Sequence, residues 1–527
     1  MRRSGGTPLA VLRGSFITGL LMLAVSAVFA VVACGARTGL VPLPRDAGDT
    51  CNEPTTLQAT IHACDGGQPT TISGTIYDPG AHDPLFNVVV YVPGTAVQPL
   101  STGASCDSCS GLYTGHPIVT ALTDSAGRFV ITNAPDGDNI PLVVQVGKWR
   151  REFTIAKVTP CTDNPLPDRA LTLPKNHVEG DIPNIAVSTG GADTLECLLT
   201  RIGLDASEYG PGANGPGRIH IFEGSPRDLS IDSGTSENPL CEAGVQRGTT
   251  SVPNAGPTTP LSYQALWDST SDIMRYDLVL FSCEGTETAH MNQQVLFDYA
   301  QAGGRVFASH YHYSWFNTGP FSAAANLAEW TRGATAIEPL VCSETGAIGG
   351  EVVTTLPNGQ PFAGGQAMQD WLTTVGAVGP DGLVSLANVR HNADIGPENL
   401  ATEWVAAGPD SVYGVGNPLM PVSTSAEGAT LYMSFNTPIG APPENQCGQV
   451  IFSDLHASAS AGDQPDAAAA PEECANVPLT PDEKILEFML FNLSSCVQSQ
   501  GLPAPPPACG MGTDGGTAGG RGPDGGL

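Results

Sequence analysis

Histidine residues follow two apolar segments in the second half of the chain that read as buried strands. The segment "GGRVFASHYHYSWF" leads directly into His310 and His312, and "GQVIFSDLHAS" leads into Asp454 and His456. Imidazole is the side chain most often used for proton transfer and metal binding, and three imidazoles with a water would form an open, zinc-type site. The candidate metal ligands are therefore His310, His312 and His456, and the candidate acid–base residues are His310, His312, Glu284 and Asp454.

The same histidine segment is rich in aromatic residues, which supports a second interpretation. Tyr311, His312 and Tyr313 could turn into an aromatic cluster with Trp315 and Phe316. The histidines would then have only a structural role, or the rings of Tyr311, Tyr313 and Trp315 would contact a ligand such as a glycan. The residue types leave both interpretations open.

Residues 182–497 predict a scaffold that brings strand ends together. Apolar segments alternate there with amphipathic ones, which is typical of a mainly parallel sheet covered by helices on both faces. We predict an open doubly wound α/β (flavodoxin-like) domain, in which ligands bind at the carboxyl ends of the strands. The expected strands are 184–191, 217–224, 276–285, 305–312, 350–355, 428–436 and 448–458, and the expected helices are 194–204, 262–274, 290–304, 365–376 and 481–493.

Capping residues mark the ends of two of these helices. Asp193 with Glu196 is expected to form a capping box on the first helix, and Thr480 with Glu483 a second one on the last, where Pro481 takes the first helical position.

Residues 70–165 predict a small β-sandwich. Short β-branched and alternating segments occur at 71–78, 87–94 and 127–132, and 140–155 reads as a hairpin around Gly147. The succession "SGTIYD", "NVVVYV" and "TDSAGRFVITNAPDG" resembles the carboxypeptidase regulatory-like domain, a transthyretin-like fold. That resemblance implies an accessory binding or spacer module without catalytic residues.

The stretch "YDLVLFSCEG…LFDYAQAGGRVFASHYH" is similar to the ThuA-like branch of the class I glutamine amidotransferase-like fold. In true amidotransferases a nucleophilic cysteine occupies the sharp turn after the second strand. The corresponding position here is His310, and residues 307–316 contain no cysteine. The resemblance therefore implies the fold while arguing against glutaminase activity. Cys283 ends a different strand, where an oxidising compartment favours a bonded or buried residue.

The N-terminus has the features of an export signal. Arg2, Arg3 and Arg13 precede the apolar run 14–33, and Cys34 follows at once. An uncleaved membrane anchor is the alternative, since the run is long enough to span a bilayer. The motif "VVAC" resembles the lipobox of bacterial lipoproteins, which implies lipidation at Cys34 and an outer-membrane location.

Charge and cysteine content agree with an exported protein. The net charge of −30 disfavours non-specific nucleic-acid binding. Fourteen cysteines predict disulfides. Cys106 is expected in a structural disulfide, with Cys109 or Cys161 as its partner, and Cys447 and Cys474 are further candidates.

We therefore expect a multidomain envelope lipoprotein. Its expected parts are a signal peptide (1–33), a flexible tether (34–69), the sandwich (70–165), a linker (166–181), the α/β domain (182–497) and a disordered Gly/Pro-rich tail (498–527). The expected role is non-catalytic binding or scaffolding, toward a glycan or another envelope ligand. The alternative is a metal-assisted hydrolase or sugar-modifying enzyme, with zinc as the candidate cofactor.

Overall fold

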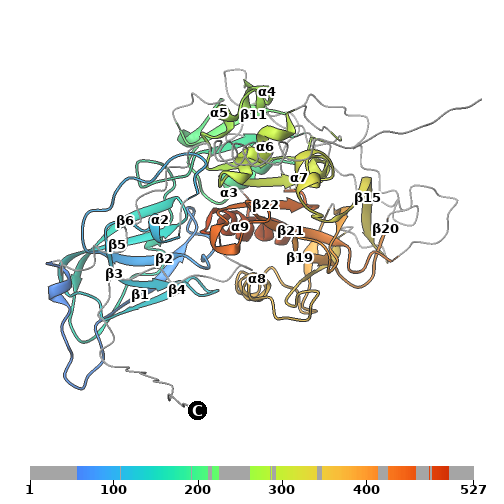
Figure 1. The fold of residues 1–527 in the computed structure, drawn as a ribbon. Helices are drawn as coiled ribbons and strands as arrows, with labels where there is room; N and C mark the ends of the chain where they lie inside the picture. Colours follow the sequence, from blue (N-terminus) through green and yellow to red (C-terminus); the bar gives the residue numbers. More distant parts are fainter. Residues whose placement is uncertain are drawn as a thin grey trace, which may run out of the picture. The chain divides into compact units, whose positions relative to one another are not determined.

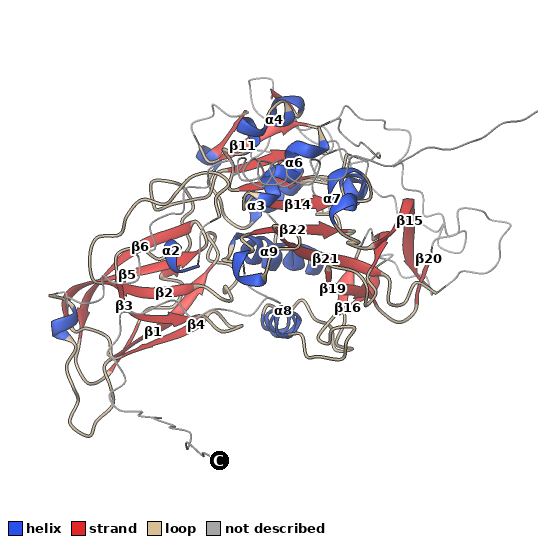
Figure 2. Ribbon diagram, viewed as in Figure 1, coloured by secondary structure: helices blue, strands red, loops and turns tan. Residues whose placement is uncertain are grey.

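Three β-sheets organise the chain in the computed structural model (Figure 2). The structure describes residues 56–106, 109–190, 193–211, 217–224, 261–284, 287, 292–340, 347–387, 389–413, 425–457, 474 and 477–497. Within them the protein is β-rich, with several sheets and fewer helices.

Two four-stranded sheets form the first part of the chain (Figure 1). One contains β1 (Thr71–Tyr77), β4 (Arg128–Thr132), β7 (Asp163–Pro165) and β8 (Leu171–Thr172), and the other contains β2 (Val89–Pro93), β3 (Pro117–Leu122), β5 (Gly137–Val146) and β6 (Trp149–Val158). Ile72 and Phe129 of the first sheet share one apolar core with Val90 and Val144 of the second. A short helix, α2 (Cys109–Leu112), lies between β2 and β3 in sequence. This arrangement follows from the alternation of apolar residues along β1 and β4.

The β5–β6 hairpin turns at Gly147, as its sequence predicts, with φ +55°. A Cβ built on Gly147 would stand 1.7 Å from the carbonyl oxygen of Ser494, which ends helix α9 (Pro481–Ser494). Glycine is required here both for the positive φ and for the close backbone approach.

The segment before β1 is attached to the first sheet pair. Cys64 forms a disulfide with Cys161, and the His62 ring contacts the Asp136 carboxylate at 2.5 Å. A 3-10 turn, η3 (Gln58–Thr60), precedes them. The expectation of a flexible tether over 34–69 is therefore wrong for residues 56–69. The Cys64–Cys161 disulfide and the His62–Asp136 contact fix this segment to the sandwich.

The largest sheet begins with six parallel strands in the order β10-β11-β9-β13-β14-β22. These strands are β9 (Ile185–Ser188), β10 (Tyr209–Pro211), β11 (Ile219–Glu223), β13 (Leu278–Phe281), β14 (Arg305–Ser309) and β22 (Gly448–Ser453), and β12 (Leu261–Ser262) also pairs with β11. Five of these six strands lie within predicted strand segments, and β10 adds a strand at the edge of the sheet.

Side chains alternate along these strands between two apolar clusters. Leu278 and Leu280 belong to the cluster that includes residues of α3 (Leu195–Arg201) and α9, whereas Val279 and Phe281 belong to the other cluster. Helices of that second cluster are α4 (Gln264–Trp267), α5 (Thr270–Ile273) and α6 (Gln293–Gln301). Both faces of the parallel part are therefore covered, as uninterrupted apolar strands require.

An antiparallel half continues the sheet beyond β22. Strand β21 (Thr430–Thr437) runs antiparallel to β22, and further antiparallel pairings follow. They involve β15 (Glu329–Pro339), β16 (Ile348–Val352), β17 (Val384–Leu386), β18 (Arg390–Asp394), β19 (Thr402–Ala407) and β20 (Ser411–Tyr413). The expectation of a mainly parallel sheet is wrong here, because β18 and β19 carry polar residues and lack the apolar run of a doubly buried strand.

Helix ends agree with the sequence at one place and differ at another. Thr480 and Glu483 form the predicted capping box of α9, whereas Asp193 does not cap α3, whose N-cap is Thr194 and has no side-chain capping bond. The remaining helices are α7 (Gly319–Ala324), α8 (Ala363–Thr374) and the 3-10 turns η4 (Ala206–Glu208), η6 (His310–Trp315) and η7 (Pro443–Asn445). None of the described helices is long and apolar enough to cross a membrane.

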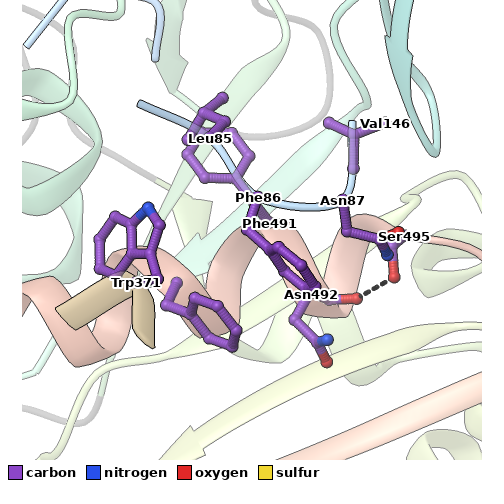
Figure 3. Close-up of a pocket in the computed structure, with 9 residues that line it drawn as sticks. Leu85, Phe86, Asn87, Val146, Trp371, Phe491, Asn492 and Ser495 are labelled. Atoms are coloured by element: carbon purple, nitrogen blue, oxygen red, sulfur yellow. Dashed lines mark hydrogen bonds between the residues drawn. The ribbon is translucent and has the colours of Figure 1, made fainter. Parts of the chain in front are cut away.

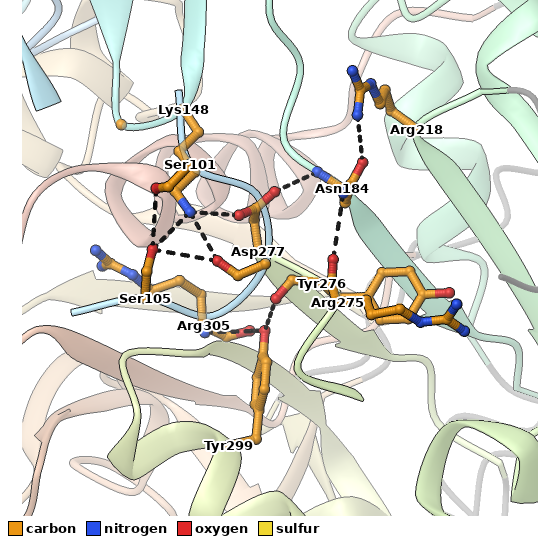
Figure 4. A network of polar contacts seen from close by, with 12 residues as sticks. Ser101, Ser105, Lys148, Asn184, Arg218, Arg275, Tyr276, Asp277, Tyr299 and Arg305 are labelled. Atoms are coloured by element: carbon orange, nitrogen blue, oxygen red, sulfur yellow. Dashed lines mark hydrogen bonds and ion pairs between the residues drawn. The ribbon is translucent and has the colours of Figure 1, made fainter. Parts of the chain in front are cut away.

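A buried polar network joins the β5–β6 hairpin to the start of β13 (Figure 4). The Lys148 ammonium donates to Asp277 Oδ1 at 2.7 Å, to Ser105 Oγ at 2.9 Å and to the Gly103 carbonyl at 2.8 Å. Asp277 also accepts from the Asn184 amide at 2.7 Å. The described residues, from 56 onward, belong to one compact unit.

Disulfides add covalent links between distant segments. Cys106 pairs with Cys447 and Cys197 pairs with Cys474. The expectation that Cys106 pairs with Cys109 or Cys161 is wrong, because the loop around Cys106 packs against the turn at Gly303, which brings Cys106 to Cys447.

Candidate functional site

Three buried side chains meet at the carboxyl end of the parallel strands. Cys283 follows β13, His310 follows β14 and His456 follows β22. Each offers one ligand atom, and these atoms all lie within 4.8 Å of one another. We call Cys283, His310 and His456 the thiol–imidazole cluster.

His310 enters the cluster through an unusual backbone conformation. Its φ is +49°, a left-handed value that side chains other than glycine rarely adopt. The chain leaves β14 there and starts η6, and the His310 ring lies against Cys283 and His456, which follow β13 and β22. Strained backbone of this kind concentrates at functional sites.

Contacts within the cluster involve both partners of His310. Its Nδ1 lies 3.1 Å from Cys283 Sγ, and its ring centroid lies 4.8 Å from that of His456, with the rings nearly perpendicular. Burial holds the pKa of His310 well below its ordinary value, and the nearby His456, Arg390 and His312 lower that pKa further. A neutral imidazole is the form that binds metal ions.

His312 lies outside the cluster. Its Nε2 is 2.9 Å from the Ser282 carbonyl oxygen, and its ring packs on Phe281. The structure therefore brings His310 and His456 together with Cys283 and not with His312, because the chain enters the 3-10 turn η6 at His310 instead of continuing the strand.

Asp193 is a site residue that the sequence did not reveal. Its Oδ2 accepts from Ser309 Oγ at 2.7 Å, and its Oδ1 accepts from the Ala457 amide at 2.8 Å and the Thr194 amide at 2.9 Å. The Cys283 amide also donates to this carboxylate. Burial raises the pKa of Asp193 to about 6, against the hydrogen bonds, which lower it. An aspartate directly before a helix predicts an N-cap, so the sequence pattern gave no reason to expect these contacts.

Glycine permits this approach of the loop after β9. A Cβ on Gly190 would stand 2.0 Å from the Cys283 carbonyl oxygen, so only glycine allows the two backbones to pack together. The Gly190-Gly191 pair was the visible signal, although Gly191 itself lies outside the described residues.

The two carboxylates proposed as acid–base candidates lie elsewhere. Asp454 Oδ2 accepts from the Asn392 amide at 2.8 Å, and burial raises the pKa of Asp454 to about 7. Glu284 is buried near Gly224, since a Cβ built on that glycine would stand 3.4 Å from Glu284 Oε1. Neither carboxylate belongs to the thiol–imidazole cluster.

The aromatic residues of η6 are mainly core residues. Tyr313 stacks on Trp330, and Trp315 stacks on Phe281. Both rings are fully buried, and Tyr311 packs on His310 with 9% exposure. The expected ligand contact through Tyr313 and Trp315 is wrong for this structure, because apolar packing leaves these rings no surface for a glycan.

Two small cavities lie away from the cluster. One of about 10 Å³ lies beside Phe86, Trp371 and Phe491 (Figure 3), which is at the lower limit for a single water. Another of about 30 Å³ is lined by Lys148, Asp277 and Arg305. Both are too small for a substrate.

The expected lipidation residue Cys34, the expected signal peptide (1–33) and the expected tail from residue 498 lie outside the described residues.

Comparisons with known proteins give no relative that identifies the chain. No family model and no curated protein matches it. Among solved structures, two interface mutants of a type II cohesin–X-dockerin complex from Acetivibrio cellulolyticus align at 18% and 17% identity, with TM-scores of 0.15 and 0.14. Each alignment covers 28% of this chain and 78% of the other. A 9R-lipoxygenase from Cyanothece PCC8801 aligns at 20% identity and TM-score 0.13, over 20% of this chain and 17% of that enzyme. Similarities this low leave the function to the site itself.

Proposed function

We propose that the chain is a cell-envelope protein whose α/β part binds a transition-metal ion through the Cys283 thiolate and the imidazoles of His310 and His456. The observation that carries this proposal is the convergence of these three side chains, all buried, within 4.8 Å. One sulfur and two nitrogen ligands suit zinc and its neighbours rather than calcium or magnesium, which prefer oxygen.

The spacing of the cluster is close to that of a metal site. Zn–S and Zn–N bonds of about 2.3 and 2.0 Å imply that one sulfur and two nitrogens around a tetrahedral zinc stand about 3.3–3.5 Å apart. Separations of up to 4.8 Å therefore need to shorten by about 1.3–1.5 Å. His310 Nε2 is buried without a hydrogen-bond partner among the described residues, and coordination would satisfy it.

A metal-assisted hydrolase is the second candidate function. Three protein ligands leave one coordination position for a water or substrate, as in catalytic zinc sites. A bound metal there would supply Lewis acidity and a water of lowered pKa. A metal-free binding or scaffold role toward an envelope ligand is the outcome that remains if no metal binds.

Fold and location form part of the same proposal. The order β11-β9-β13-β14-β22 corresponds to the 2-1-3-4-5 order of flavodoxin-like folds, which supports a doubly wound α/β domain behind a transthyretin-like sandwich. The N-terminal sequence supports lipidation at Cys34 and an outer-membrane location. Changing Cys34→Ser should remove the processed, detergent-partitioning form.

Metal content of the purified full chain tests the proposal. We expect about one zinc or cobalt ion per chain after stripping with a chelator and reloading, with a thiolate-to-cobalt charge-transfer band in the ultraviolet. Cys283→Ser should abolish that band, and His310→Gln and His456→Gln should abolish stoichiometric binding.

His312→Gln is the matched control, because it removes a neighbouring buried imidazole that lies outside the thiol–imidazole cluster, with its Nε2 2.9 Å from the Ser282 carbonyl oxygen and its ring on Phe281. It should retain the metal. A folded wild-type chain that binds no metal refutes the proposal, and loss of metal in His312→Gln would restore the ligand set expected from the sequence.

A further inference from the structure

Asp193 contacts the chain beside every member of the thiol–imidazole cluster. Ser309, whose hydroxyl donates to Oδ2 at 2.7 Å, directly precedes His310. Ala457, whose amide donates to Oδ1 at 2.8 Å, directly follows His456. The third donor is the backbone amide of Cys283 itself.

Capping of α3 does not account for these contacts. A capping aspartate binds the amides of the second or third helical residue, whereas Asp193 binds the amide of Thr194, the N-cap itself. The other three donors are Ser309, the last residue of β14, and the residues Cys283 and Ala457, which follow β13 and β22; all are 90 or more residues from Asp193 in sequence. Its carboxylate thus lies where three parallel strands end.

We propose that Asp193 is the positioning residue of the metal site, fixing the backbone at Cys283, His310 and His456 so that their ligand atoms stay within reach of one ion. This proposal rests on the proposed metal binding. Groups that orient metal ligands from behind typically change metal affinity 10- to 100-fold when removed. Asp193 would act through the peptide groups beside the ligands and not through their rings.

The hydroxyl of Ser309 offers an independent test of the same contact. It donates to Asp193 and also lies 3.1 Å from the Phe281 carbonyl oxygen. Ser309→Ala therefore removes the hydrogen bond between β14 and the Asp193 carboxylate, while the bonds from the amides of Cys283 and Ala457 remain. The variant should weaken metal binding in the same direction as Asp193→Asn but by less.

Chelator-competition titration of the full chain with zinc, together with the cobalt spectrum, tests the proposal. We expect Asp193→Asn to bind zinc roughly 10- to 100-fold more weakly and to shift the cobalt bands, since the ligand geometry changes. Asp277→Asn is the matched control, because Asp277 is a buried carboxylate at the opposite ends of the same strands. It should lower stability and leave zinc affinity unchanged.

Each outcome separates the two proposals. A wild-type chain that binds no metal overturns the metal site and this inference with it. Wild-type binding together with unchanged affinity and spectrum in Asp193→Asn overturns the positioning role alone. If Asp193→Asn does not fold, unchanged zinc affinity in folded Ser309→Ala overturns it, and so does an equal loss of affinity in Asp277→Asn, which would reveal a general effect of stability.

Discussion

Replacing Lys148 by methionine should destabilise the protein by leaving a buried carboxylate without its cation. Lys148 and Asp277 are only 14% and 6% exposed, and their ion pair measures 2.7 Å. Removing one partner of a buried pair typically costs about 3–5 kcal/mol. The adjacent cavity of about 30 Å³ is large enough for a water that could solvate the carboxylate, so we expect a loss near the lower end, about 3 kcal/mol at pH 8.

The loss in Lys148→Met should depend on pH, because Asp277 can escape its unpaired charge by binding a proton. Burial already raises the pKa of Asp277, and the lysine counteracts that rise. Without the lysine the folded-state pKa rises further above the unfolded value of about 4. The folded state then binds more protons than the unfolded state, so the variant loses stability as the pH increases from about 4 upward.

Urea unfolding of Lys148→Met, Asp277→Asn and the double variant measures these effects. The double variant should be more stable at pH 8 than Lys148→Met alone, because the amide carries no charge to leave unpaired. A Lys148→Met chain within about 0.5 kcal/mol of wild type at pH 8 would refute the reasoning. So would a loss of equal size at pH 4 and pH 8.

Three further predictions concern stability. Burial raises the pKa of Glu403 to about 7, so the charged carboxylate destabilises the folded state as the pH rises from about 4.5 to 7. The free energy of unfolding of Glu403→Gln should equal that of wild type near pH 4 and exceed it by up to about 3 kcal/mol at pH 8. The exposed Glu427→Gln should show no such difference in the same unfolding curves. Cys106→Ser with Cys447→Ser removes a link across 341 residues and should cost about 2–4 kcal/mol, and an unchanged melting temperature in the oxidised double variant would contradict it. Thr480→Ala should cost about 1 kcal/mol by thermal unfolding, since its hydroxyl accepts from the Glu483 amide; equal stability would show that the cap is dispensable.

Local sequence signals predicted the elements that local physics controls. The capping box at Thr480 and the glycine turn at Gly147 depend on a few neighbouring residues, and both occur. The parallel strands before β22 were visible because burial on both faces demands continuous apolar runs. Strands β18 and β19 were missed, because antiparallel strands with polar residues carry no such run.

Disulfide partners show where local signals end. The number of cysteines predicted disulfides in general, whereas the partners of Cys64, Cys106 and Cys161 depend on which loops pack together. Cys106 lies 341 residues from its partner Cys447, so only the assembled fold relates them.

The composition of the thiol–imidazole cluster depends on strand register and on one turn. Phe281 pairs with Ala308, so continuing that register places Cys283 level with His310. Ser309 pairs with Ser453, which by the same rule would place Asp454 beside His310. The chain turns instead, since the Leu455 amide donates to Ser453 Oγ at 3.0 Å, and Asp454 binds the Asn392 amide. His456 then reaches His310.

A single hydrogen-bonded turn after β22 therefore decides whether a carboxylate or an imidazole faces the thiol. Oxygen in that position would favour harder cations, whereas nitrogen beside sulfur favours zinc and its neighbours. The residue types of "SDLH" allow either arrangement, and both Asp454 and His456 are candidate site residues for that reason. The choice between them follows from the packing of β22 against β14 on one side and from the antiparallel strands β21 and β18 on the other, which the apolar pattern of β22 alone does not encode.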